Sequence, residues 1–149
     1  MTDMSDIVWS LDTRRDQVGD LAARLRAFGS DLLERRGVEW TVNAPGEALQ
    51  LHVSADVRRE LYLVFKEAIH NIAKHSGAHK AMLSFSLQNG HIRGEAMDDG
   101  VGLRSDRLDG TGIASMKARV EGLGGRLEIL AADSNGTVVR VSVPISRKA

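Results

Sequence analysis

Apolar residues recur at helical spacing in three parts of the chain. They fall three or four positions apart over residues 16–36, and the same spacing returns over 56–76 and 111–123. Glycines follow each of these stretches and favour a helix end there, while Ser54 can cap the second helix. The pattern therefore predicts three amphipathic helices.

Alternating apolar and polar residues predict strands in most of the remaining chain. Six such segments are expected, at 38–43, 49–53, 80–87, 91–97, 126–130 and 138–143. The Pro-Gly pair at 45–46 should join the first two as an antiparallel pair, and the Asn-Gly pairs at 89–90 and 135–136 are strong hairpin signals. Hairpins interspersed with helices favour an α+β fold, a two-layer sandwich in which about three helices cover one face of a mixed, mostly antiparallel sheet.

Composition narrows the class of protein. A chain of 149 residues, 42% of them apolar, suits one globular domain. Its 20 basic and 20 acidic side chains cancel, which argues against nucleic-acid binding. The absence of cysteine excludes disulfides and thiolate metal sites and fits a cytoplasmic location. No apolar run approaches the roughly 18 residues of a membrane span, so we expect no membrane contact by this segment.

A polar stripe runs along one side of the predicted 56–76 helix. At about 100° per residue, Asn71, Lys74 and His75 fall within about 80° of Glu67, apart from the apolar side. Asn71 can supply an oxygen ligand to Mg²⁺, and Lys74 and His75 can contact phosphate. Glu67 can accept a proton from an attacking group or orient that group. A solvated helix face is the commoner explanation of such a stripe, so the stripe needs independent support.

One acidic segment could read a nucleotide base. Asp98 ends the 91–97 strand, and Gly100 and Gly102 lack a Cβ, so the backbone can turn and a ligand can approach closely. The Asp98 carboxylate can accept a hydrogen bond from the exocyclic amine of adenine, a donor that guanine does not offer at the corresponding edge. Alternation along the strand places Asp99 on the opposite, solvated face. An ordinary Asp-Gly turn is the simpler alternative.

A second glycine segment could hold phosphate. Gly110-Thr111-Gly112 opens the third helix, whose free backbone N–H groups suit an anion. It is not a Walker loop, because no Gly-Lys-Ser/Thr follows, and it lacks the third glycine of a dinucleotide-binding fingerprint. The five histidines show no zinc-binding spacing, and there is no Gly-x-Ser-x-Gly elbow. Phosphoryl chemistry on a Mg-nucleotide is therefore the favoured interpretation.

Over residues 16–146 the chain resembles the GHKL, or Bergerat-fold, ATPases (HATPase_c). Its motifs match the N, G1 and G2 boxes and the terminal strands of that superfamily. In chain order they are Glu67-x-x-x-Asn71-x-x-Lys74-His75, Asp98-x-Gly100-x-Gly102, Gly110-Thr111-Gly112-Ile113 and Gly136-Thr137. Within the superfamily the chain looks most like the catalytic domain of bacterial two-component sensor histidine kinases, of the nitrate-sensor-like group with a short lid. The segment 110–119, followed by the Gly-Gly pair at 124–125, is characteristic of that group.

The resemblance implies a role for each motif residue. ATP would lie between the helices under a mobile lid at 103–109. Asn71 would hold Mg²⁺, Glu67 would be the catalytic acid/base, and Asp98 would read adenine. The other ATP-binding residues would be Lys74, His75, Gly100, Gly102, Gly110, Thr111, Gly112 and Ile113.

The chain also departs from the resemblance. Kinases of this type carry the phosphate-accepting histidine on an upstream dimerising hairpin, and none of the five histidines has that context. Residues 1–15 resemble the tail of that hairpin, and residues 16–149 would form the catalytic domain. The apolar side chains of Ile7, Val8, Trp9 and Leu11 need to be buried, either by a partner segment or by this same domain. Gly94 stands where a larger residue is usual for packing, which weakens the expectation that this strand is regular.

These features predict a histidine protein kinase, incomplete in that it lacks its phosphoacceptor histidine. It would pass the γ-phosphoryl of Mg-ATP to the hairpin of the same full-length kinase, which would serve a response regulator. The full-length protein could be anchored in a membrane. An anti-sigma-factor-type serine kinase is the enzyme alternative, and a degenerate nucleotide- or partner-binding module is the alternative of another class.

Overall fold

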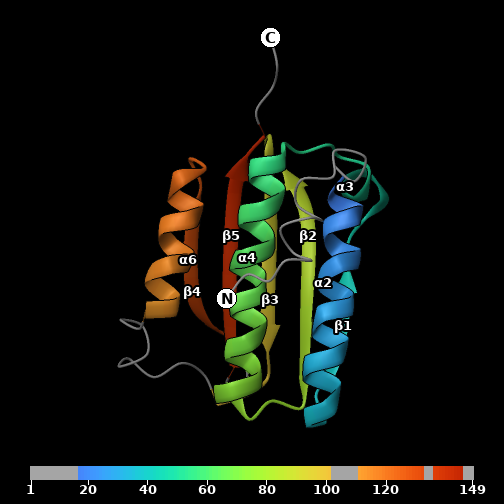
Figure 1. The fold of residues 1–149 in the computed structure, drawn as a ribbon, viewed down its shortest axis with the longest axis vertical. Coiled ribbons are helices and arrows are strands. Elements are labelled where there is room, and N and C mark those ends of the chain that lie inside the picture. The colour runs from blue at the N-terminus through green and yellow to red at the C-terminus, as the bar shows by residue number, and fades with distance from the viewer. Residues whose placement is uncertain (1–16, 102–110, 133–135, 146–149) are drawn as a thin grey trace.

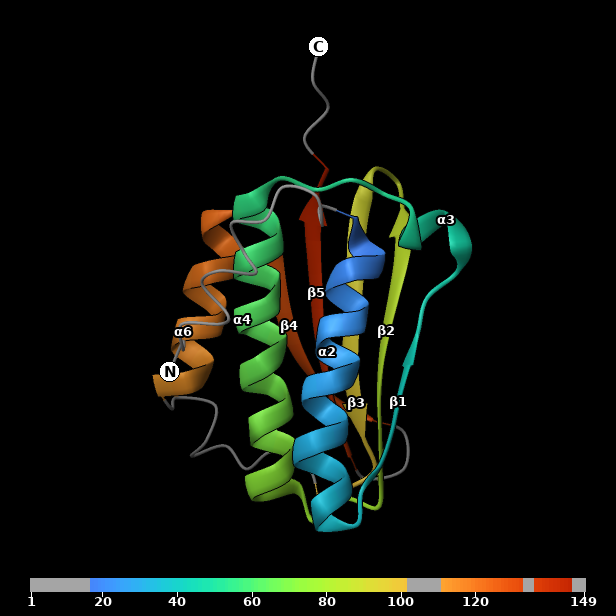
Figure 2. The same cartoon turned by 45° about the vertical axis from the view of Figure 1, so that its right-hand side comes forward.

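The computed structural model describes residues 17–101, 111–132 and 136–145, which form two layers (Figures 1 and 2). One layer holds three long helices side by side, α2 (Val18–Leu33), α4 (Ala55–Asn71) and α6 (Thr111–Gly122), with α4 in the middle. The other layer is a five-stranded sheet of β1 (Glu39–Asn43), β2 (Lys80–Gln88), β3 (His91–Asp98), β4 (Arg126–Ala132) and β5 (Gly136–Pro144). The predicted α+β sandwich with helices on one face is confirmed.

The sheet is mixed and mostly antiparallel, in the order β1-β2-β3-β5-β4. β1 pairs in parallel with β2, and the other three pairings are antiparallel. The β2–β3 hairpin turns at Asn89 and Gly90, whose φ angles of 52° and 77° fit the predicted Asn-Gly turn. Among the described residues, no helix is long and apolar enough to cross a membrane.

The predicted strand at 49–53 is wrong. Pro45 caps a short helix, α3 (Gly46–Leu49), because its fixed φ suits the start of a helical turn. The chain then runs on to α4 without joining the sheet, and His52 forms an isolated β-bridge with Gln17. β1 therefore pairs in parallel with β2, from Glu39 opposite Lys80 to Asn43 opposite Ser84, instead of forming the predicted hairpin.

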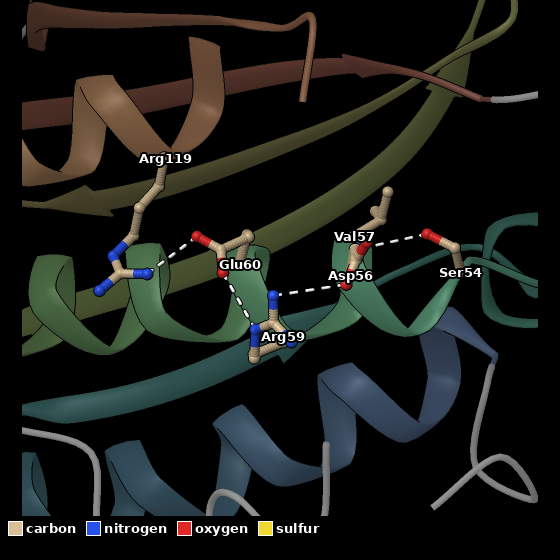
Figure 3. A network of polar contacts seen from close by, with 6 residues as sticks. All are labelled: Ser54, Asp56, Val57, Arg59, Glu60 and Arg119. Carbon is tan, nitrogen blue, oxygen red and sulfur yellow. Dashed lines mark hydrogen bonds and ion pairs between the residues drawn. The ribbon is translucent and has the colours of Figure 1, made fainter. Parts of the chain in front are cut away.

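Helix α4 forms the centre of the core. Ser54 caps its first turn as predicted, its Oγ accepting a hydrogen bond of 3.2 Å from the backbone N–H of Val57 (Figure 3). Its core-facing apolar residues are buried, namely Leu61, Phe65, Ala68 and Ile69, and so is Ile72 directly after the helix. The helix thus shows one side to the sheet and leaves another for the polar residues.

Gly94 does not disturb β3, and the predicted strand is regular there. The strand keeps continuous pairing with β2 and β5 on its two sides. A Cβ at Gly94 would lie 2.5 Å from Cζ of Phe65. The missing side chain makes room for that ring, which meets Phe85 edge to face with centroids 5.6 Å apart. Gly94 is thus a packing feature of the helix–sheet interface.

Candidate functional site

The polar residue Glu67 of α4 lies directly against Gly112 at the start of α6. A Cβ on Gly112 would stand 2.5 Å from Oε2 of Glu67 and 3.1 Å from its Cδ. The carboxylate therefore occupies the space that any other residue at 112 would fill. The structure brings together two motif residues that the sequence separates by 45 positions.

An ion pair fixes the same two helices two turns away (Figure 3). Nη1 of Arg119 lies 2.8 Å from Oε1 of Glu60, and Arg59 Nε contacts the other carboxylate oxygen at 3.1 Å. Glu60 precedes Glu67 by seven residues and Arg119 follows Gly112 by seven, so the helices run antiparallel in one register. A seven-residue step is about 10.5 Å of helix. The ion pair thus holds α6 where Gly112 faces Glu67.

A groove of about 290 Å³ opens between α4 and α6. Its lining comes from Leu63, Lys66, Glu67 and His70 of α4 and from Ser115, Met116 and Arg119 of α6. Among these, sequence reasoning assigned a role only to Glu67. The missed α4 residues follow i, i+3, i+4, i+7 spacing and so share a face with it, which is the signal that could have found them.

The side chains of Lys66 and His70 affect the charge in this groove. The ammonium of Lys66 lies 5.3 Å from the ring centroid of Phe28 in α2 and 5.7 Å from that of Tyr62 in α4. His70 meets Phe28 edge to face at 5.3 Å. Burial lowers the pKa of His70, although the charge of Glu67 acts in the opposite direction. The lining of the groove therefore holds one carboxylate, two cationic side chains and an imidazole whose lowered pKa favours its neutral form.

Asp98 stands buried at the end of β3, between Ala81 of β2 and Thr137 of β5. Its residue is only 9% exposed, and Oδ1 accepts a hydrogen bond of 2.8 Å from the backbone N–H of Gly100. Burial raises the pKa of Asp98, the charge of Asp99 adds to that, and the backbone N–H groups of Gly100 and Thr137 oppose it. An ionised carboxylate has more acceptor sites than these donors use, so it can receive a ligand N–H.

Asp99 is exposed, as predicted, but it is tied to the fold. Its carboxylate accepts hydrogen bonds from the backbone N–H groups of His79, at 2.8 Å, and Lys80, at 2.9 Å. These two donors lower the pKa of Asp99. The neighbouring aspartates thus differ: Asp99 anchors the start of β2, and Asp98 faces the interior.

The stripe along α4 is only partly as predicted. Residues Ile72–Ser76 form a π-helical turn, so the extrapolation at about 100° per residue is wrong beyond Asn71. Asn71 is the last residue of α4 and half-buried, and Lys74 is exposed. The side chain of His75 lies outside the described part of the structure. A π turn widens the backbone at the point where α4 delivers these groups.

The remaining motif residues divide into two groups. Ile113 is buried in the core, and the backbone of Thr111 begins α6. Gly102, Gly110 and the predicted lid at 103–109 lie outside the described residues. The ends of α4 and β3 and the beginnings of α6 and β5 meet at one end of the molecule (Figure 1). The described motif segments therefore gather at a single end of the fold.

A protein-family comparison agrees with this geometry. The model of the family described as "Histidine kinase-, DNA gyrase B-, and HSP90-like ATPase" matches residues 56–147. Sensor histidine kinase LiaS of Bacillus subtilis is 29% identical over 110 residues, which are 72% of this chain and 29% of LiaS. The histidine-protein kinase/phosphatase UhpB of Salmonella typhimurium is 32% identical over 130 residues, 83% of this chain and 24% of UhpB. The chain spans less than a third of each relative.

Solved structures show the same fold. The histidine kinase domain of the blue-light activated histidine kinase EL346 from Erythrobacter litoralis superposes with a TM-score of 0.76 at 19% identity. The match covers 95% of this chain and 69% of that one. At this identity the likeness concerns the fold, while the family match covers more than half of the chain. This chain belongs to the family of histidine kinase-, DNA gyrase B- and HSP90-like ATPases.

Proposed function

We propose that this chain is the ATP-binding catalytic domain of a sensor histidine kinase, transferring the γ-phosphoryl of Mg-ATP to a histidine outside the chain. The observation that carries the proposal is the contact of Glu67 with Gly112. It sets a carboxylate beside the first turn of α6, where backbone N–H groups suit phosphate. The histidine kinases among the relatives support this acceptor. The nitrate-sensor-like subtype stays a prediction.

Asp98 would hold the other end of the nucleotide. Its carboxylate would accept from the N6 amine of adenine, with Gly100 leaving space for the base. Burial of Asp98 supports this role, because a hydrogen bond to a charged acceptor is stronger where water is excluded. As the resemblance implies, the rest of the nucleotide site would be lined by Lys74, His75, Gly102, Gly110, Thr111 and Ile113.

Asn71 would hold Mg²⁺ by its amide oxygen. Among the described residues, no group of three or more His, Cys, Asp and Glu side chains is placed to hold a metal ion. A single amide oxygen fits Mg²⁺, because this ion takes few protein ligands and completes its coordination shell with phosphates and water. Bound there, Mg²⁺ would neutralise charge on the transferred phosphoryl group.

Glu67 would serve the acceptor rather than the nucleotide. Its carboxylate would accept a hydrogen bond from one imidazole N–H, turning the lone pair of the other nitrogen toward the γ-phosphorus. That nitrogen would form the new N–P bond as the bond to the bridging oxygen breaks and ADP departs. The groove between α4 and α6, with Glu67 in its lining, supports approach from that side.

The same proposal implies how this domain would work within the full-length kinase. Residues 1–15 would be the end of the upstream dimerisation segment, and the acceptor hairpin would belong to the same kinase. A response-regulator aspartate would receive the phosphoryl group from that hairpin. The domain would act in the cytoplasm, where ATP is available.

Calorimetry and labelling together test the proposal. The chain should bind ADP with Mg²⁺ and transfer labelled phosphate from ATP to a separately produced hairpin bearing the histidine. The label should be acid-labile, as a phosphohistidine is. Acid-stable label on serine would assign the serine-kinase alternative, and absence of nucleotide binding would leave only a degenerate binding module.

A further inference from the structure

An apolar groove lies at the opposite end of the molecule from the candidate site. It encloses about 400 Å³, and its apolar wall consists of Val53, Val57, Ile92, Pro144 and Ile145. These residues come from the loop before α4, the first turn of α4, the start of β3 and the end of β5, which meet at one end of the fold (Figure 2). His52 and Ser54 supply the polar part of the lining.

The chain enters the described fold at the edge of this groove. Gln17 forms an isolated antiparallel bridge with His52, and their side-chain Nε2 atoms lie 3.4 Å apart. The backbone N–H of Val18 donates to the carbonyl of Leu51 at 2.8 Å. Whatever precedes Gln17 is therefore delivered beside a residue that lines the groove.

The sequence just upstream is apolar enough to fill it. Ile7, Val8, Trp9 and Leu11 precede Gln17 and lie outside the described residues. Residues 10–16 can span up to roughly 25 Å when extended, so Trp9 can reach the groove. We propose that the segment 7–11 docks in this groove, with Trp9 as its anchor. A tryptophan buries roughly 150–250 Å² and seeks a partner for its N–H, which His52 or Ser54 can supply.

Docking there would connect the upstream segment to α4. Val57 lies in the first turn of this helix, ten residues before Glu67. The incoming chain would thus hold the same rigid element that carries the candidate acid/base. The inference does not depend on nucleotide binding, so it stands or falls separately from the proposed function.

Thiol accessibility tests the docking, because the chain has no cysteine of its own. Val57→Cys places a thiol in the groove, and Lys117→Cys places a control thiol on an exposed position of α6. We expect DTNB to react about tenfold faster with the groove thiol when Trp9→Ser and Leu11→Ser are added, a ratio equivalent to ~1.4 kcal/mol of docking. The control thiol on α6 should react equally fast in both backgrounds. Equal rates at the groove thiol would overturn the proposal.

Tryptophan emission in a cysteine-free chain gives a second test. The fluorescence of Trp9 is obtained by subtracting the spectrum of Trp9→Phe from that of the parent. This fluorescence should be protected from quenching by iodide. Ile145→Glu in the groove should expose it and shift it to the red, while the buried Trp40 stays unchanged. A Trp9 contribution as quenchable as free indole would overturn the docking. Protection that rises with protein concentration would assign the groove to a second copy, and would overturn it equally.

Discussion

The carboxylate of Glu67 and the backbone of Gly112 share a space with no room for a further carbon, since a Cβ at 112 would come within 2.5 Å of Oε2. The atom in the way is the far end of a flexible side chain. Gly112→Ala should therefore displace Glu67 rather than break the fold, and alanine is the better helix former by roughly 0.5–1 kcal/mol. We expect phosphotransfer to the acceptor histidine to fall about 10²-fold, because misplacing a catalytic group by about 1 Å costs that much.

The matched control for that substitution lies in the same helix. A Cβ at Gly122 would meet nothing within 4 Å, so Gly122→Ala should leave the rate near the parent value without lowering stability. Thermal unfolding should show both variants folded, and single-turnover labelling of the hairpin gives the rates. Unchanged phosphotransfer in Gly112→Ala would remove Glu67 from the reaction.

The ion pair between Glu60 and Arg119 should matter more for rate than for stability. The Arg119 side chain is 37% exposed, and an ion pair of this kind contributes less than about 1 kcal/mol. Arg119→Met should nevertheless let α6 shift against α4 and slow phosphotransfer several-fold, whereas Arg119→Lys should keep most of the rate. Arg126→Met, which removes the exposed pair with Glu128, is the control. If Arg119→Met lowered the free energy of unfolding but not the rate of phosphotransfer, the ion pair would have a purely structural role.

Binding of adenine nucleotides should weaken in acid through Asp98. Burial raises the pKa of this carboxyl, and only its ionised form accepts fully from the adenine amine. Affinity for ADP should thus be highest above the raised pKa and fall as the pH falls through it. Asp98→Asn should lose this dependence and cost about 1.5 kcal/mol or more of binding, the scale of a hydrogen bond to a charged group. Calorimetry from neutral to mildly acid pH, with GDP as competitor, measures both effects.

Local signals predicted much of this fold. The Asn89-Gly90 turn and the two faces of α4 depend on residues near each other in sequence, so pattern alone was sufficient. The strand at 49–53 was wrongly expected because the segment after Pro45 forms α3, and β1 pairs instead with β2, which is distant in the sequence. The π turn after Asn71 leaves no mark in apolar spacing, and it is there that the predicted stripe fails.

Individual residues of the candidate site were named from the sequence, but their contacts were not. Glu67 and Gly112 were both expected, yet their contact depends on the antiparallel register of α4 and α6. The ion pair between Glu60 and Arg119 fixes that register. The two residues are 59 positions apart, and no sequence pattern marks them as partners. His70 was overlooked because a single histidine on a helix has no distinguishing pattern.

Asp99 should stabilise the fold in a pH-dependent way. The backbone N–H groups of His79 and Lys80 lower its pKa below the ordinary value of 3.8. Its contribution is therefore complete above that ordinary value and is lost as the pH falls through the lower, folded-state pKa. Asp99→Ala should lower the free energy of unfolding at neutral pH, and the difference from the parent should shrink below pH 3.8. Urea titrations at neutral and acid pH test this, with exposed Glu121→Ala as control.

Asn71 should govern the metal dependence of binding rather than binding itself. Its amide oxygen is the proposed protein ligand of Mg²⁺, whereas Asp98 would grip the base without the ion. Asn71→Ala should leave metal-free ADP binding nearly unchanged and abolish the gain from adding Mg²⁺. Asn71→Asp keeps an oxygen ligand and should retain most of that gain. Calorimetry with ADP in EDTA and in Mg²⁺ separates metal-free binding from the gain in affinity that Mg²⁺ gives. If Asn71→Ala kept the full Mg²⁺ dependence, the ion would bind elsewhere.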